Sequence, residues 1–251
     1  MSHLARKRFG QNFLVDDQIV NRIVSTISPK KSDNIVEIGP GKGALTFPLL
    51  EHLDHLSVIE IDRDLISLLK LKKQDKLTIY EADALKFDYG LISNNLRIVG
   101  NLPYNISSPL LFHLLSSKNK IIDMTFMLQK EVVDRIVAKH DSKTYGRLSV
   151  MMQTFFEVES MFTVPKESFD PQPKIESAIL YLKTRTKPLT ENTKLLEKIV
   201  KVSFSQRRKT LKNCLKSILS QEQTEIDLSQ RAEMLSVENF ITLMKDYEKQ
   251  N

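Results

Sequence analysis

The chain has 251 residues, of which 41% are hydrophobic and 27% are charged, and its formal net charge is +6 at pH 7. This length and composition are typical of a globular protein with one large domain or a main domain and a small one. No apolar run approaches the roughly 20 residues of a membrane span, and no secretory signal precedes the first expected helix, so a cytoplasmic protein without a membrane segment is expected. The single cysteine, Cys214, cannot form an internal disulfide, and no Cys/His spacing resembles a zinc site.

Positive charge is concentrated in two short segments. One is Arg6-Lys7-Arg8 near the start of the chain, and the other is Gln206-Arg207-Arg208-Lys209 near its end. The net charge favours long-range attraction to a polyanion. Each cluster, taken alone, is as typical of a solvated surface as of a contact with RNA.

From Asn34 onward, short apolar runs alternate with longer amphipathic segments, as they do in βαβ units. Parallel strands need crossover connections, so this alternation predicts a Rossmann-like, doubly wound, mostly parallel sheet. Ligands bind such sheets at the carboxyl ends of the strands, which makes the residues just after each run the candidate functional positions. The expected strands are residues 35–38, 56–59, 77–80, 96–99 and 124–128.

The sequence changes character after about Phe155. Residues 155–159 and 177–182 are expected to form an antiparallel hairpin that completes a seven-stranded sheet, with a proline-bearing loop over 164–174 between them. Residues 184–190 are expected to be a linker, which divides the chain into domains of residues 1–185 and 186–251. The second domain is expected to be small and all-helical. Its segment 202–220 has apolar residues at helical spacing and places Arg207 and Arg208 on other faces of that helix.

A glycine-rich loop follows the first strand of the predicted sheet. Three of the seven glycines fall in Glu37-Ile38-Gly39-Pro40-Gly41-Lys42-Gly43. Glycine allows the backbone to approach a ligand where a Cβ atom would clash. Because Gly39-x-Gly41-x-x-Ala44 also fits the dinucleotide fingerprint, the loop alone does not separate a nicotinamide cofactor from S-adenosylmethionine.

Two acidic residues follow the second and third strands. Glu60 is placed to accept hydrogen bonds from the ribose hydroxyls of a nucleotide-like cofactor, whereas Asp62 and Asp64 are better read as acids that open a helix. Asp83 either accepts a hydrogen bond from the exocyclic amine of adenine or caps a helix.

The fourth strand ends in Gly100-Asn101-Leu102-Pro103-Tyr104, which points to methylation of an adenine amine. The lone pair of that nitrogen is delocalised into the ring, so a catalyst has to localise it. The side-chain oxygen of Asn101 and the backbone carbonyl of Leu102 can do so by accepting hydrogen bonds from the amino group, without a strong base. Pro103 stiffens the turn. A strand-to-helix turn of purely conformational origin is the alternative.

Two aromatic residues are candidates for holding a target base. Tyr104 offers a flat face on which an extruded base can stack. Phe169 lies in the proline-bearing loop, where an exposed ring would form the second wall of a base sandwich. Packing of Phe169 against the hairpin is the alternative.

The chain resembles the KsgA family of small-subunit ribosomal RNA adenine dimethyltransferases along nearly its whole length. The matching segments, in chain order, are Arg8-Phe9-Gly10-Gln11-Asn12-Phe13-Leu14, Val36-Glu37-Ile38-Gly39-Pro40-Gly41, Val58-Ile59-Glu60, Gly100-Asn101-Leu102-Pro103-Tyr104-Asn105-Ile106-Ser107, Met127-Leu128-Gln129-Lys130-Glu131-Val132, Tyr145-Gly146-Arg147-Leu148-Ser149-Val150, the Phe169 loop and Phe204-Ser205-Gln206-Arg207-Arg208-Lys209.

The resemblance implies dimethylation of N6 on two adjacent adenosines in the loop of the 3′-terminal hairpin of small-subunit (16S) rRNA, late in subunit assembly. Residues 1–185 would be the S-adenosylmethionine-dependent methyltransferase domain and residues 186–251 an RNA-binding domain. The partner would be an immature small ribosomal subunit, and the protein is expected to be a monomer that needs no metal. The implied cofactor contacts are Asn12, Leu14, Gly39, Glu60, Asp83 and Asn101, with Tyr104 and Phe169 stacking the target base and Arg207 and Arg208 binding RNA.

Three rival functions are considered. A methyltransferase of the same fold that acts on large-subunit rRNA would share the core motifs, but Asn105-Ile106-Ser107 after the reactive turn and the basic segment at 206–209 favour the small-subunit enzyme. A non-catalytic assembly factor would bind the immature subunit and use methylation only for its release. A dehydrogenase would fit the glycine loop but needs none of the residues Asn101 to Tyr104.

Overall fold

The structure is a computed structural model, and it describes residues 12–72 and 74–250. The basic segment at residues 6–8 and residues 8–11 of the first matching motif lie outside the described residues. No helix in the described part of the chain is long and apolar enough to cross a membrane.

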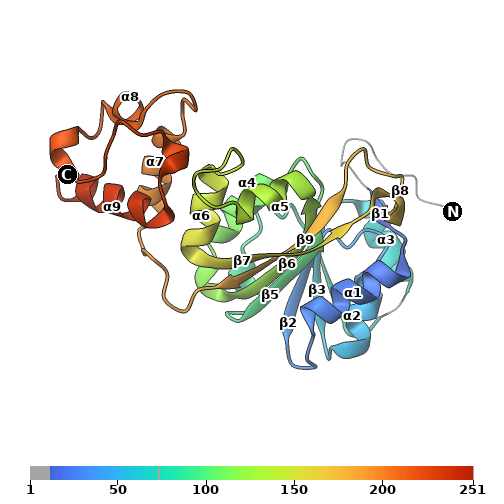
Figure 1. The fold of residues 1–251 in the computed structure, drawn as a ribbon. Coiled ribbons are helices and arrows are strands. Elements are labelled where there is room, and N and C mark those ends of the chain that lie inside the picture. Colours follow the sequence, from blue (N-terminus) through green and yellow to red (C-terminus); the bar gives the residue numbers. More distant parts are fainter. Residues whose placement is uncertain (1–11, 73, 251) are drawn as a thin grey trace. The chain divides into compact units, whose positions relative to one another are not determined.

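A sheet of seven strands, in the order β4-β3-β2-β5-β6-β9-β7, forms the centre of the fold (Figure 1). The first five of these strands pair in parallel, and β9 runs antiparallel to β6. The predicted mostly parallel seven-stranded sheet is therefore confirmed, because each expected apolar run is a strand. The strands are β2 (Asn34–Ile38), β3 (Leu56–Glu60), β4 (Leu77–Glu81), β5 (Leu96–Asn101), β6 (Ile121–Gln129), β7 (Phe156–Val164) and β9 (Ser177–Thr184).

A second sheet of two short strands joins segments that are far apart in the sequence. Strand β1 (Phe13–Leu14) pairs antiparallel with β8 (Phe169–Asp170), so that Leu14 lies opposite Phe169. The Ser168 side chain also donates a hydrogen bond to Asp16 at 2.9 Å. These contacts fix the segment after β7 against the start of the described chain.

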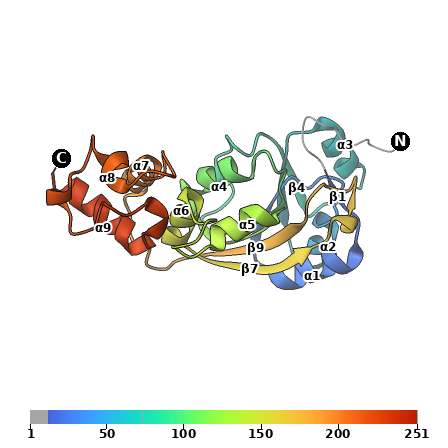
Figure 2. The same ribbon diagram turned by 45° about the horizontal axis from the view of Figure 1, so that its top comes forward.

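Helices cover both faces of the large sheet. Helices α1 and α4 lie on opposite sides of it (Figures 1 and 2), and the apolar residues of α1 and α2 share one core cluster with the sheet. The helices are α1 (Asp17–Ile27), α2 (Thr46–His52), α3 (Arg63–Leu71), α4 (Ser107–Leu115), α5 (Lys130–Val137), α6 (Arg147–Phe155), α7 (Thr193–Ser203), α8 (Leu211–Leu215) and α9 (Val237–Glu248). Short 3₁₀ turns cover Tyr89–Leu91, Lys118–Lys120, Lys166–Ser168, Gln221–Gln223 and Ala232–Met234.

The chain forms two compact units. The first comprises Met1–Val133 and Glu159–Thr184, and the second comprises Asp134–Val158 and Arg185–Asn251. The last change of unit, between Thr184 and Arg185, lies next to the predicted domain boundary at residues 185 and 186. The second unit also contains residues 134–158, which the prediction placed in the first domain. The reason is packing: α6 contacts both α7 and α9 within the second unit.

The predicted helix over 202–220 is wrong. Helix α7 ends at Ser203, and residues 204–210 form an irregular segment that carries Arg207 and Arg208. Contacts from distant parts of the second unit replace the helical hydrogen bonds. The Phe204 ring stacks on Phe240 at 5.5 Å between ring centroids, and the backbone amide of Leu211 donates to the Gln230 carbonyl at 2.8 Å.

At the amino ends of the strands, Arg97 connects helix α1 to the sheet. Its guanidinium is 2.6 Å from an Asp33 carboxylate oxygen and 3.0 Å from an Asp123 oxygen, and it donates to the Ile27 carbonyl at the end of α1. Only 13% of the Arg97 side chain is exposed. A buried charge with this many partners is costly to leave unpaired.

We expect Arg97→Ala to lower the free energy of unfolding by about 3 kcal/mol, because it leaves the Asp123 carboxylate buried without its cation. Urea denaturation measures this loss. Arg63→Ala is the matched control, since the Arg63 side chain, which pairs with Glu81, is 85% exposed. The control should lose less than about 1 kcal/mol. Equal losses in the two variants would contradict the prediction.

Candidate active site

A cavity of about 320 Å³ opens at the carboxyl ends of strands β2 to β5, where the sequence predicted a ligand site. Short segments after each of these strands form its walls, together with β1 and the residues beside it. It brings together eight of the predicted site residues, namely Asn12, Leu14, Gly39, Glu60, Asp83, Asn101, Leu102 and Tyr104.

The glycine loop after β2 forms one wall through backbone conformations that side chains disfavour. Gly39 has φ +66° and Gly41 has φ +58°, both in the left-handed region that glycine adopts readily. Gly100, at the end of β5, matters for another reason: a Cβ atom there would lie 2.5 Å from the Ile38 carbonyl oxygen. Glycine at this position therefore allows the end of β5 to lie close to the loop.

Glu60 is almost completely buried at the end of β3. One carboxylate oxygen accepts hydrogen bonds from the backbone amides of Ile61 at 2.8 Å and Asp62 at 2.9 Å. Burial raises the pKa of Glu60 above its usual value, although these hydrogen bonds oppose the shift. Asp62 has the other role that the sequence predicted, because it caps α3 by accepting from the Asp64 amide.

Asp83 lies in the turn after β4 and lines the cavity. Its carboxylate accepts a hydrogen bond from the Leu85 amide at 3.0 Å, and its carbonyl accepts from the Lys86 amide. No α-helix begins here, so Asp83 stabilises a turn and is not a helix cap. A role for this carboxylate in binding a ligand stays a prediction.

The Asn101 side chain is oriented by the start of the described chain. Its amide nitrogen donates to the Asn12 carbonyl at 3.1 Å, which leaves the Asn101 side-chain oxygen as the acceptor of the pair. The next residue, Leu102, is held by a hydrogen bond from its amide to the Met127 carbonyl on β6 at 3.1 Å. The two residues of the predicted reactive site are thus each held by a hydrogen bond to a different segment.

Pro103 and Tyr104 continue the turn into α4. The Pro103 carbonyl accepts from the Ile106 amide at 3.1 Å, which closes a tight turn. Tyr104 is half-buried, and its hydroxyl lies 3.0 Å from the Ser177 hydroxyl at the start of β9. This contact ties one edge of the Tyr104 ring to the sheet while the residue still lines the cavity.

Phe169 is buried, as in the second of the two arrangements that the sequence left open. Only 3% of it is exposed, and its side chain belongs to the core cluster that includes Leu14, Val164 and Ile179. The prolines do not hold the loop away from the protein, because the pairing of β8 with β1 folds it inward. Phe169 is not among the residues that line the cavity, and its role in stacking a target base stays a prediction.

Glu37 lines the cavity beneath the glycine loop and had no role assigned from the sequence. It is 1% exposed, and its carboxyl accepts a hydrogen bond from the Thr46 hydroxyl at 2.6 Å. Burial raises the pKa of Glu37 to about 7, and the nearby Glu60 adds to the shift. The signal in the sequence was an acid inside an otherwise apolar strand.

We expect Glu37 to make the protein less stable as pH rises. Its folded-state pKa of about 7 exceeds its usual 4.5, so the folded state binds the proton more tightly than the unfolded state does. Its contribution to the free energy of unfolding should fall by about 3 kcal/mol between roughly pH 4.5 and 7. Urea denaturation across this range should show a shallower decline in Glu37→Gln than in the wild type. The matched control is Glu51→Gln, which changes an exposed acid on α2 and should decline in stability as the wild type does. If the stability of this control fell as little with pH as that of Glu37→Gln, the pH dependence could not be assigned to Glu37.

Solved structures resemble this chain in overall fold. A dimethyladenosine transferase from Plasmodium falciparum superposes with a TM-score of 0.82 at 26% identity, covering 95% of this chain and 98% of that one. The 23S rRNA methyltransferase ErmE superposes with a TM-score of 0.73 at 26% identity, covering 94% of this chain and 100% of that one. Together with the cavity at the carboxyl ends of the strands, these similarities define a class I methyltransferase.

Sequence comparison narrows the class. The ribosomal RNA adenine dimethylase family matches residues 2–249. A ribosomal RNA small subunit methyltransferase A from Methylobacillus flagellatus is 53% identical over 97% of this chain and 98% of its own length. One from Nitrosospira multiformis is 51% identical over 97% of this chain and 96% of its own. The chain belongs to the ribosomal RNA adenine dimethylase family.

Proposed function

We propose that this protein transfers methyl groups from S-adenosylmethionine to N6 of two adjacent adenosines in the loop of the 3′-terminal hairpin of small-subunit rRNA. The products are N6,N6-dimethyladenosines, formed during ribosome biogenesis. The observation that carries the proposal is the turn from Asn101 to Tyr104, which presents oriented acceptors in a cavity beside a glycine loop. The relatives named as small subunit methyltransferases favour this substrate.

The cavity suits a nucleoside cofactor. Gly39 allows close approach of the loop backbone, Glu60 supplies a buried carboxylate for ribose hydroxyls, and Asp83 supplies an acceptor for the adenine amine. Asn12, Leu14 and Asn101 complete the proposed cofactor contacts. When bound, S-adenosylmethionine supplies an electrophilic methyl group on a sulfonium. No metal takes part in this proposal.

The proposed chemistry of the protein is hydrogen bonding to the target amine. The Asn101 side-chain oxygen and the Leu102 carbonyl accept from the amino group and so localise its lone pair in the direction of the methyl group. The proton that the amine loses passes to solvent, so no strong base is required. Tyr104 offers its ring to the extruded base, a contact worth about 1–3 kcal/mol in comparable sites.

We expect Asn101→Ala to reduce kcat by about 10²–10³-fold, as loss of one preorganised hydrogen-bonding group typically does. The assay incubates the protein with S-adenosylmethionine and immature small subunits and maps the methylated bases. Asn95→Ala, in an exposed loop, is the control and should retain activity.

The same assay, run in parallel on immature small subunits and on large subunits, separates the rival functions. Methylation confined to large-subunit rRNA would overturn the proposal in favour of the activity named for ErmE, whose fold this chain shares. Asn101→Ala should still bind the immature subunit, because the variant leaves the RNA-binding residues intact. If the wild type bound the subunit without methylating it, an assembly factor would be the better description.

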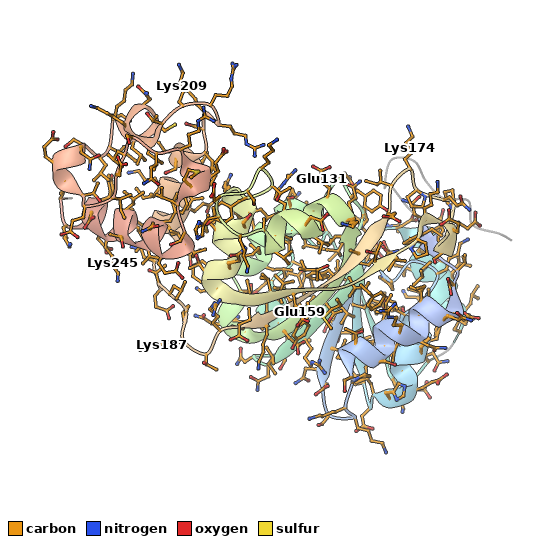
Figure 3. All side chains as sticks on the ribbon, viewed as in Figure 1. Glu131, Glu159, Lys174, Lys187, Lys209 and Lys245 are labelled. Atoms are coloured by element: carbon orange, nitrogen blue, oxygen red, sulfur yellow. The ribbon has the colours of Figure 1, made fainter. Side chains whose placement is uncertain are left out.

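Arg207 and Arg208 are proposed to bind the RNA backbone as part of the region 186–251. Both are exposed in the segment between α7 and α8, and the Arg207 guanidinium also donates to the Lys143 carbonyl at 2.7 Å. Arg207 therefore holds this basic segment against the loop that carries Lys143, while Arg208 is available for phosphate. Figure 3 shows the neighbouring Lys209 on the opposite side of the second unit from Lys245.

We expect the double variant Arg207→Ala, Arg208→Ala to weaken RNA binding and to reduce its dependence on salt. The slope of log K against log salt should become shallower by roughly 0.7–0.9 for each phosphate that the variant no longer neutralises. Filter binding at several salt concentrations measures the slope. Lys245→Ala is the matched control and should leave the slope unchanged, and both variants should keep the wild-type affinity for S-adenosylmethionine. A change of equal size in Lys245→Ala would show that the effect is one of net charge alone.

Two further properties belong to the same proposal. A functional monomer is part of this proposal. An rRNA substrate within an immature small subunit supports a cytoplasmic site of action.

A further inference from the structure

Tyr89 is a completely buried residue with a polar contact that the chemistry above does not use. It begins the short 3₁₀ turn Tyr89–Leu91, and its exposed fraction is 0%. The hydroxyl donates a hydrogen bond to the Ala84 carbonyl at 3.0 Å. Tyr89 does not line the cavity, whereas Ala84 does.

The Ala84 carbonyl belongs to the turn that carries Asp83 into the cavity. This turn is attached to β3 at one end, where the Ala82 amide donates to the Glu60 carbonyl at 3.0 Å. Tyr89 attaches it at the other end. The Asp83 carboxylate, which lies between the two attachments, therefore depends on both for its position.

Packing against two other rings fixes the Tyr89 ring itself. The ring meets Phe87 edge-on at 5.4 Å between centroids and lies 5.8 Å from the His113 ring on α4. His113 also lies 3.0 Å, through its Nε2 atom, from the Phe87 carbonyl. Because α4 begins directly after the reactive turn, the cluster joins the Asp83 turn to the helix that follows Tyr104.

We propose that Tyr89 is a positioning residue for recognition of the cofactor's adenine, acting through the Ala84 carbonyl on the Asp83 turn. The inference rests on the proposed function, in which Asp83 accepts a hydrogen bond from the adenine amine. Burial and the negative charge of Asp83 both raise the pKa of Tyr89, so the hydroxyl keeps its proton and remains a donor. The specificity of the site for adenine then depends on a hydroxyl outside the cavity.

Tyr89→Phe tests the proposal because it removes one oxygen atom and keeps the ring. Loss of this hydrogen bond should raise KM for S-adenosylmethionine about fivefold to tenfold. The value of kcat at saturating cofactor should stay within about twofold, because Asn101 and Leu102 are untouched. Retained kcat also establishes that the variant is folded.

A second readout reports recognition of the base directly. Affinity is measured for S-adenosylhomocysteine and for its analogue with hydrogen in place of the 6-amino group. The wild type should prefer the amino form, and Tyr89→Phe should lower this preference severalfold. If Tyr89→Phe only loosened the cavity, the affinities for both ligands would fall equally and the preference would stay unchanged. That result would overturn the proposal.

Tyr145→Phe is the matched control. Tyr145 is 1% exposed in the second unit, and its hydroxyl has no hydrogen-bond partner among the described residues. Removing that oxygen should change neither KM nor the preference for the amino form. An effect as large as that of Tyr89→Phe would overturn the proposal.

Asp83→Ala separates this inference from the function beneath it, because alanine removes the side-chain acceptor. If the preference persists in Asp83→Ala, then Asp83 does not read the base, and the proposed roles of both Asp83 and Tyr89 fail. If Asp83→Ala loses the preference while Tyr89→Phe retains it, only the role of Tyr89 fails. Loss in both variants supports the two roles together.

Discussion

The site depends on the close approach of two backbones, at Gly100 on β5 and Ile38 on β2. A side chain at Gly100 would lie 2.5 Å from the Ile38 carbonyl oxygen, so these strand ends come together only with glycine at that position. Because of this approach, the reactive turn after β5 lies next to the glycine loop after β2. A methyl donor and a methyl acceptor need walls that are this near to each other, and parallel pairing of β2 with β5 supplies them.

Residues at the cavity surface are held in place by hydrogen bonds from neighbouring segments. The Asn101 amide is oriented by the Asn12 carbonyl, Leu102 by β6, and the Asp83 turn by Tyr89. Catalysis that relies on neutral hydrogen-bond acceptors needs such support, because neutral groups give less tolerance for misplacement than a charged base would. Of these partners, Met127 lies on β6, Asn12 directly precedes β1, and Tyr89 begins a 3₁₀ turn.

The sequence was sufficient for the features that depend on local pattern. Each apolar run is a strand, and the residues after the strand ends meet in one cavity, since parallel strands end at a common edge. Features that depend on contacts between residues far apart in the chain could not be predicted from the sequence. The burial of Phe169 follows from pairing with Leu14, and the irregular segment at Arg207 is held by a hydrogen bond to the Lys143 carbonyl. Helical spacing and proline content contain no information about either partner.

The pairing of β1 with β8 has a consequence for biosynthesis. Asn12 and Leu14 contribute to the cavity wall, yet the strand that holds β1 in place lies at Phe169–Asp170, and the Tyr104 hydroxyl contacts Ser177 later still. A nascent chain that has emerged only as far as β6 has the glycine loop and the reactive turn but lacks these supports. The cavity and its supports therefore become complete only after β9 has left the ribosome, so the site forms late in the synthesis of the chain.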